Sequence, residues 1–121
     1  MKILITGSNG LLGQKIVRQL KKNKKSFLAT SLGENRNPDC PNAFYRSLDI
    51  SNQALVNEVI KDYNPDAVIH TAAITNVDYC ETNPNLCHEV NVTATAYLFE
   101  ATQKTGGHFS LLSTDFVFDG E

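Results

Sequence analysis

Tryptophan is absent from the sequence, and cysteine and methionine are scarce. Its 121 residues include one methionine and three cysteines, Cys40, Cys80 and Cys87. The spacing of these cysteines matches no zinc-binding pattern, so we expect free thiols and no metal site. There is no run of about 18 apolar residues, which argues against a transmembrane helix. No secretory signal pattern opens the chain, and we expect a cytoplasmic protein.

The sequence also has no large excess of charge of one sign. Eleven basic and 13 acidic residues give a formal net charge of −2. The densest cationic run is Lys21, Lys22, Lys24 and Lys25, at the end of a predicted helix, where lysines interact favourably with the helix dipole. This distribution argues against nucleic-acid and anionic membrane partners.

Strand and helix patterns alternate along the chain. Short apolar runs predict strands at residues 2–6, 26–30, 45–48, 67–71 and 108–113. The spacing of Leu12, Ile16 and Leu20 predicts a helix after the first strand. Further helices are expected after Ser51, a candidate N-cap, and after Asn83. Five such strands predict a Rossmann-like, doubly wound parallel α/β sheet in one domain that spans the chain.

Three glycines lie between the first predicted strand and the first predicted helix. Gly7 permits a sharp turn, Gly10 lets a ligand approach the backbone, and Gly13 lets the helix pack closely. The helix start also presents free amide groups and a partial positive charge to phosphates. The pattern predicts a nucleotide site, with a purely structural tight turn as the alternative. The expected cofactor contacts here are Gly7, Ser8, Asn9, Gly10, Leu11, Leu12 and Gly13.

The end of the second predicted strand bears on the type of cofactor. NAD binders place an acidic residue there to hold the ribose 2′-hydroxyl. The segment has Thr30 and Ser31 instead, and Glu34 comes only later in the loop. Hydroxyl groups together with Arg36 suit a 2′-phosphate, so NADP(H) is favoured over NAD(H), with Ser31 and Arg36 as contacts. Arg36 is also compatible with an ordinary surface position.

Further motifs follow the later predicted strands. They are Asp49-Ile50, Thr71-Ala72-Ala73, Asn91-Val92 and residues 113–118, which read S-T-D-F-V-F. Together with the G-x-x-G-x-x-G spacing, they resemble the extended short-chain dehydrogenase/reductase superfamily, and most of all the dTDP-4-dehydrorhamnose reductases, over the whole chain. The resemblance implies cofactor contacts at Asp49, Ile50, Thr71, Ala72, Ala73, Asn91 and Leu112. It implies substrate contacts at Thr75, Thr114 and Asp115.

Most of these positions also have a structural explanation. Asp49 suits the start of a helix, and the alanines after Thr71 suit close packing against a sheet. Asn91 lies beside the apolar stripe of its helix, which favours a buried hydrogen-bonded network, although an exposed position stays open. Thr75 begins a capping-box pattern, an interpretation that we prefer to a substrate contact.

Catalysis in the resembled family uses a Ser or Thr together with Tyr-x-x-x-Lys. Thr114 matches the first of these and would hydrogen-bond the substrate carbonyl. No Tyr-x-x-x-Lys occurs in the chain, because the residues four positions after its tyrosines are Asp49, Ala67, Asn83 and Ala101. The resemblance puts that motif past residue 121, so we expect an incomplete domain without the C-terminal substrate lobe. Such a fragment is expected to bind nucleotide without turnover and to leave the edge of its fifth strand unpaired.

The function expected from the resemblance is NAD(P)H-dependent reduction of the 4-keto group of a nucleotide sugar. A nucleotide-sugar epimerase or dehydratase is one alternative. Another is a non-catalytic NADP-binding module like the regulatory β subunit of methionine adenosyltransferase, whose S-S-D-Y-V-F-D-G stretch is echoed by Phe118-Asp119-Gly120. The expected partner is a small-molecule nucleotide sugar, and a homodimer is carried as a hypothesis.

Overall fold

The protein forms one sheet with helices on both of its faces. The computed structural model describes residues 1–71, 92–112 and 117–119. The strand order in the sheet is β3-β2-β1-β4-β5-β6. The strands are β1 (Lys2–Thr6), β2 (Ser26–Ser31), β3 (Tyr45–Ser47), β4 (Ala67–His70), β5 (His108–Leu112) and β6 (Val117–Asp119).

Strands β1 to β5 are parallel, as the alternation of strands and helices predicts. In the central strand β1, Ile5 is level with Ala29 of β2 on one side and with Ile69 of β4 on the other. Leu4 and Ile5 are fully buried, as expected for a strand that is covered on both faces. The predicted Rossmann-like α/β fold is thereby confirmed.

Strand β6 is a feature that the sequence pattern did not predict. It pairs antiparallel with β5, and Leu111 lies opposite Phe118. Only residues 113–116 separate the two strands, and so short a connection permits an antiparallel return but not a parallel crossover. The expectation of an unpaired edge at the fifth strand was therefore wrong.

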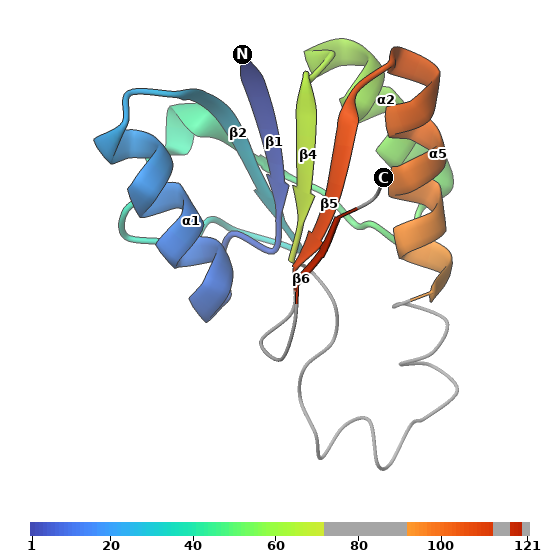
Figure 1. Ribbon diagram of the computed structural model, residues 1–121. Coiled ribbons are helices and arrows are strands. Elements are labelled where there is room, and N and C mark those ends of the chain that lie inside the picture. The colour runs from blue at the N-terminus through green and yellow to red at the C-terminus, as the bar shows by residue number, and fades with distance from the viewer. Residues whose placement is uncertain (72–91, 113–116, 120–121) are drawn as a thin grey trace.

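The helices divide between the two faces of the sheet. Figure 1 shows α1 (Leu11–Lys22) on one face, with α2 (Gln53–Tyr63) and α5 (Ala94–Thr105) on the other. A short 3-10 helix, η1 (Asn42–Phe44), precedes β3. The predicted helix start at Asn83 lies outside the described residues. In the described parts of the chain, no helix combines the length and the apolar character needed to cross a lipid bilayer.

The N-cap of α2 is Asn52 rather than the predicted Ser51. The side-chain oxygen of Asn52 accepts a hydrogen bond from the Leu55 amide at 3.2 Å. Ser51 instead donates its amide and its hydroxyl to the Asp49 carboxylate, at 3.0 and 2.6 Å. Both residue types cap helices well, and the aspartate holds Ser51 in the preceding turn, so the sequence prediction was one residue early.

Two apolar clusters, one on each face, hold the layers together. The cluster under α2 and α5 contains Leu4, Leu48, Ile50, Val56, Val59, Ile60, Val68, Ala94, Leu98, Ala101 and Phe109. The cluster under α1 contains Ile3, Ile5, Val17, Leu20, Phe27, Ala29 and Cys40. Cys40 is a buried free thiol, as predicted, whereas Cys80 and Cys87 lie outside the described residues. Successive residues of β1 serve opposite clusters because strand side chains alternate between faces.

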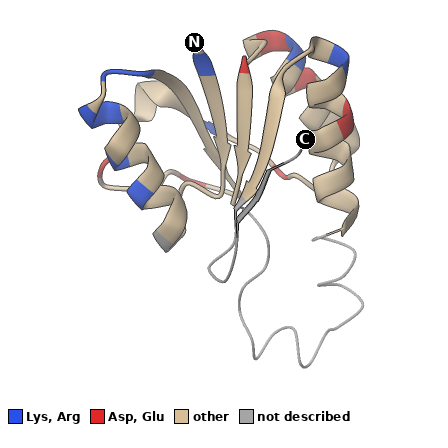
Figure 2. Cartoon of the chain, viewed as in Figure 1, with Lys and Arg blue, Asp and Glu red and all other residues tan. Residues whose placement is uncertain are grey.

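The carboxyl ends of the parallel strands meet at one edge of the sheet, the lower edge in Figure 1, where α1 begins. From β1 the chain continues to β2 and β3 on one side and then crosses to β4 and β5 on the other. Parallel sheets bind ligands in the crevice at such a reversal of strand order. Figure 2 shows that basic residues gather along α1 and in the turn that follows it. The fold therefore places the glycine-rich turn at the edge where a ligand is expected.

Candidate functional site

The turn between β1 and α1 requires glycine at its first position for two reasons. Gly7 has a φ angle of +74°, in the left-handed region that side chains disfavour. A Cβ atom there would also lie 2.6 Å from Oγ1 of Thr71 and 2.7 Å from its carbonyl carbon. Gly7 therefore lets the turn pack directly against the residue that follows β4.

Gly13 and Gly10 differ in what surrounds them. A Cβ atom on Gly13 would come within 2.8 Å of the backbone of Gly7 and of Ser8, so α1 can begin against the turn only without a side chain there. A Cβ atom on Gly10 would meet nothing closer than the Gly7 carbonyl oxygen at 3.5 Å, which is an ordinary contact. The φ angle of Gly10, −78°, is accessible to any residue. Within the described residues, neither backbone nor packing explains a glycine at position 10.

Unsatisfied hydrogen-bonding groups lie at the start of α1. Gly10 is the N-cap and offers no side chain, and the first turn contains no acidic residue. The amides of that turn have no carbonyl partner within the helix. Ser8 is fully buried, and its Oγ has no hydrogen-bond partner among the described residues. Buried polar atoms are normally paired, so the Ser8 hydroxyl adds another unsatisfied group to the free amides of this turn.

The loop after β2 is held against the glycine-rich turn by Asn9. The side-chain amide of Asn9 donates to the Glu34 carbonyl at 2.8 Å, and its side-chain oxygen accepts from the Arg36 backbone amide at 2.7 Å. Asn37, which is buried, adds a third bond from its side-chain amide to the Ser8 carbonyl at 3.0 Å. The predicted site residues Asn9 and Arg36 are thus brought together.

Tyr45 contacts the same loop from β3. Its hydroxyl lies 2.7 Å from the Gly33 carbonyl and 2.9 Å from the Ser31 carbonyl, so one proton is shared between two acceptors. Burial raises the pKa of the Tyr45 hydroxyl, although the Asn9 side chain and the Arg36 charge act in the opposite direction. Tyr45 and Asn9 therefore hold neighbouring carbonyl groups of one loop, those of Gly33 and Glu34.

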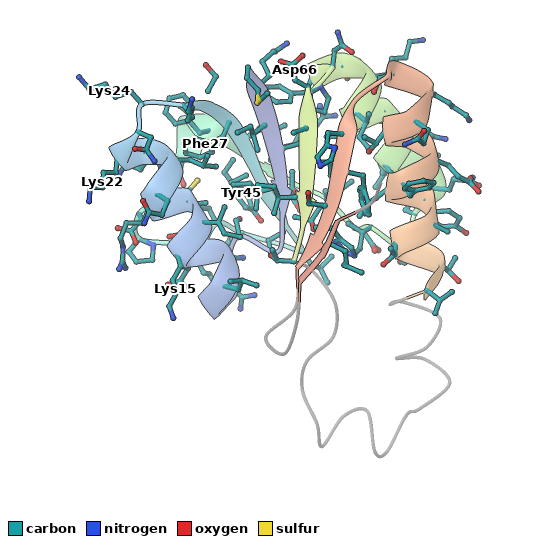
Figure 3. The ribbon with its side chains drawn as sticks, viewed as in Figure 1. Lys15, Lys22, Lys24, Phe27, Tyr45 and Asp66 are labelled. Carbon is teal, nitrogen blue, oxygen red and sulfur yellow. The ribbon has the colours of Figure 1, made fainter. Side chains whose placement is uncertain are left out.

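Arg36 is an exposed cation on this loop. It makes no ion pair with any described residue, whereas Arg18 and Arg46 both face carboxylates. Figure 3 shows that Lys15 and Lys22 of α1 point away from the sheet. An open hollow of about 610 Å³ beside the loop is lined by Gly33, Glu34, Asn35, Asn42, Tyr45 and Ser47. Arg36 thus carries an exposed charge, without a carboxylate partner among the described residues, on the loop that borders this hollow.

Asp49 and Ile50 occupy different environments in the loop between β3 and α2. Asp49 is exposed, and its carboxylate accepts both hydrogen bonds from Ser51. Ile50 is buried in the cluster under α2 and α5. A cofactor contact stays a prediction for both, and Ile50 also contributes to the core.

A series of polar side chains runs from the end of β1 through β4 to α5. The Thr6 hydroxyl accepts from the Thr71 amide at 3.0 Å and shares a hydrogen bond of 2.6 Å with Nδ1 of His70. Nε2 of His70 lies 3.1 Å from the Thr95 hydroxyl, and the position of the ring proton sets which group donates in each bond. Burial lowers the pKa of His70 from 6.5 to about 4, so the ring is neutral near pH 7. This arrangement links the strand ends at the crevice to α5.

Several predicted site residues lie outside the described part of the chain, and their contacts stay predictions. They are Ala72, Ala73, Thr75, Asn91, Thr114 and Asp115. Leu11 and Leu12 open α1, and Leu112 is the last residue of β5. Where the structure describes side chains, no cluster of three or more His, Cys, Asp or Glu residues could hold a metal ion.

Sequence reasoning missed Thr6, Asn37, Tyr45 and Thr95 as parts of this region. A polar residue that ends an apolar strand just before Gly7 was a usable signal for Thr6, because the carboxyl ends of parallel strands face the ligand edge. Asn37 and Tyr45 gave no such signal, since their partners lie 29 and 14 residues away in the sequence.

The family described as "RmlD substrate binding domain" matches residues 1–121. The chain belongs to this family. It is 38% identical over its full length to the probable low-salt glycan biosynthesis reductase Agl14 of Haloferax volcanii and covers 39% of that protein. It is 33% identical to a dTDP-4-dehydrorhamnose reductase of Aggregatibacter actinomycetemcomitans, with 98% of the chain and 36% of that protein covered. It is 32% identical to methionine adenosyltransferase 2 subunit beta of Xenopus laevis, with 98% and 34% covered.

Solved structures similar to this RmlD-family chain include oxidoreductases. A dTDP-4-dehydrorhamnose reductase from Clostridium acetobutylicum matches with a TM-score of 0.77 and 37% identity over 100% of the chain and 39% of that structure. One from Bacillus anthracis in complex with NADP has a TM-score of 0.70 and 26% identity over 89% and 34%. A Thermus thermophilus UDP-glucose 4-epimerase complex with NAD has a TM-score of 0.81 and 25% identity over 89% and 35%. These neighbours support a nicotinamide dinucleotide cofactor, and the chain spans little more than a third of each.

Proposed function

We propose that the chain is the cofactor-binding part of an NADP(H)-dependent nucleotide-sugar reductase. The proposed substrate is dTDP-4-dehydrorhamnose or a similar small-molecule nucleotide sugar, reduced at its 4-keto group. Support comes from the family match and from the reductases of Aggregatibacter and Clostridium, which align with at least 98% of the chain. A homodimeric assembly belongs to the same proposal.

The observation that carries this proposal is the bare backbone at Gly10 beside the uncapped start of α1. A diphosphate at Gly10 would accept hydrogen bonds from the first amides of α1 and interact favourably with the helix dipole. It would also offer an acceptor to the unpaired Oγ of Ser8. A side chain at position 10 would occupy this space, although the protein itself tolerates a Cβ there.

The remaining contacts follow from positions around the turn. Ser31 and Arg36 would hold the 2′-phosphate of the adenosine ribose, and Thr71 would line the cofactor after β4. When bound, the cofactor supplies a hydride to the substrate carbonyl. Thr114 would hydrogen-bond that carbonyl and orient it. Because the chain contains no Tyr-x-x-x-Lys, we propose that these 121 residues alone bind the cofactor without turnover.

Fluorescence titration of the chain with NADPH and with NADH tests the proposal. We expect saturable binding of both, tighter for NADPH. Gly10→Val should weaken both by about tenfold or more, because its side chain fills the space where the diphosphate would approach the amides. Ala54→Val adds methyl groups at an exposed position of α2 and should leave both affinities unchanged. Absence of saturable binding by the unmodified chain would overturn the proposal.

A non-catalytic regulatory module is the second candidate. The observation in its favour is the 32% identity to methionine adenosyltransferase 2 subunit beta of Xenopus laevis. Both candidates bind a nicotinamide cofactor, so the titration does not separate them. NADPH oxidation by the full-length protein in the presence of dTDP-4-dehydrorhamnose would identify a reductase. Cofactor binding without oxidation, together with a stable complex with a methionine adenosyltransferase catalytic subunit, would identify the module.

A further inference from the structure

Asn9 differs from the other residues of the glycine-rich turn in where its side chain goes. It forms two hydrogen bonds, at 2.8 and 2.7 Å, to the backbone of Glu34 and of Arg36. Its own carbonyl accepts from the Gln14 side chain at 2.9 Å, which fixes Asn9 to the first turn of α1. The side-chain amide of Asn9 is therefore bound to the loop after β2. The backbone amides of the turn stay available to a diphosphate.

The two bonds of Asn9 fix the backbone on either side of Asn35. The Arg36 guanidinium makes no ion pair with a described residue. Burial raises the pKa of the Tyr45 hydroxyl, so the hydroxyl keeps its proton and can donate near pH 7. The Tyr45 hydroxyl in turn anchors the Gly33 carbonyl at 2.7 Å. The loop that carries Arg36 is thus fixed from the turn and from β3.

We propose that Asn9 is a positioning residue for cofactor selectivity: by tying the loop to the glycine-rich turn, it holds Arg36 where the guanidinium meets a ribose 2′-phosphate. This inference rests on the proposed preference for NADP(H). Asn9 itself does not contact the phosphate. Its effect acts through the backbone of Arg36, so it discriminates between ligands with and without a 2′-phosphate while contributing little to the remainder of the nucleotide.

The test compares two ligands that differ by one phosphate, 2′,5′-ADP and AMP, by calorimetric titration of the chain. The unmodified chain should prefer 2′,5′-ADP. Asn9→Ala should reduce that preference by about three- to tenfold, with the affinity for AMP nearly unchanged, because a mobile cation loses most of its benefit to an exposed anion. Asn52→Ala removes an asparagine cap from α2 instead. It controls for general loss of stability and should keep the full preference.

A measurement on the unmodified chain supports the test if Asn9→Ala folds poorly. The Arg36 backbone amide donates to Asn9, and its hydrogen exchange should slow further with 2′,5′-ADP but not with AMP. Failure to bind NADPH and NADH overturns the proposed function and this inference together. A normal 2′-phosphate preference that Asn9→Ala leaves intact, or an equal loss of both ligands, overturns this inference alone. Hydrogen exchange of the Arg36 amide that does not change when 2′,5′-ADP is added would also overturn this inference alone.

Discussion

The Thr6 hydroxyl and the Nδ1 atom of His70 lie 2.6 Å apart, and both side chains are fully buried. Protonation of the ring would change the donors and acceptors that it presents to Thr6 and Thr95. It would also put a charge in a site from which water is excluded. Burial therefore favours the neutral ring at this contact between β1 and β4, and the stability of this part of the crevice depends on pH.

The first prediction concerns acid stability. The pKa of His70 falls from 6.5 to about 4 on folding, so the unfolded chain binds more protons between these two pH values. The stability that His70 contributes is complete above about pH 6.5 and is lost as the pH falls toward 4. Between pH 7 and pH 4, the unmodified chain should lose about 3 kcal/mol more unfolding free energy than His70→Gln.

Urea denaturation at a series of pH values measures this difference. His108→Gln, at an exposed histidine that begins β5, should follow the unmodified chain throughout. Parallel stability curves for the unmodified chain and His70→Gln would show that the buried ring does not titrate as proposed.

The second prediction separates two glycines of one turn. Gly13→Ala pushes a methyl group into the backbone of Gly7 and Ser8, and we expect a loss of about 2 kcal/mol or more in unfolding free energy. Gly10→Ala meets only an ordinary contact and changes the N-cap residue, so it should cost less than about 1 kcal/mol. Chemical denaturation of both variants gives the comparison, and equal losses would contradict it.

The third prediction concerns the start of α2. Asn52→Ala removes the acceptor for the Leu55 amide and should cost about 1 kcal/mol. Ser51→Ala removes only an exposed hydrogen bond to Asp49 and should cost less than about 0.5 kcal/mol. Thermal unfolding measured on both variants decides which residue caps the helix. A larger loss for Ser51→Ala would restore the position that the sequence pattern favoured.

The fourth prediction concerns the cofactor. Arg36→Gln removes the unpaired cation of the loop after β2 and should weaken NADPH binding by about three- to tenfold without affecting NADH. Arg46→Gln removes a cation that already faces Glu58 and Asp62, and it should change neither affinity. Fluorescence titration of both variants checks this. An Arg36→Gln variant with unchanged NADPH affinity would assign Arg36 to the ordinary surface position considered from the sequence.

The parallel part of the sheet could be predicted from the sequence because local patterns determine it. Apolar runs such as Lys2–Thr6 and the spacing of Leu12, Ile16 and Leu20 carry the period of a strand or a helix within a few residues. The three glycines were also interpretable, since their spacing reflects one local turn. Strand β6 was missed because local spacing does not indicate whether the chain turns back after β5 to pair with it.

The contacts around the site were less accessible to sequence reasoning for a similar reason. Asn9 was assigned to the cofactor, yet its side chain binds a loop 25 and 27 residues further along the chain. Ser51 and Asn52 are both good caps, and the choice between them depended on Asp49, which draws Ser51 away. Such outcomes follow from competition among polar partners that only the folded chain brings together.

The position of β1 has a consequence for how the chain assembles. This strand is made before β2 and β4 but lies between them, so one side can be paired once residue 31 has been synthesised. The other side must wait for residues 67–70, about 64 positions later, as the spacing between Thr6 and His70 shows. On a ribosome, an apolar strand with one free edge therefore persists until β4 emerges. Such an intermediate is a natural target for chaperones and a point at which slowed translation would favour aggregation.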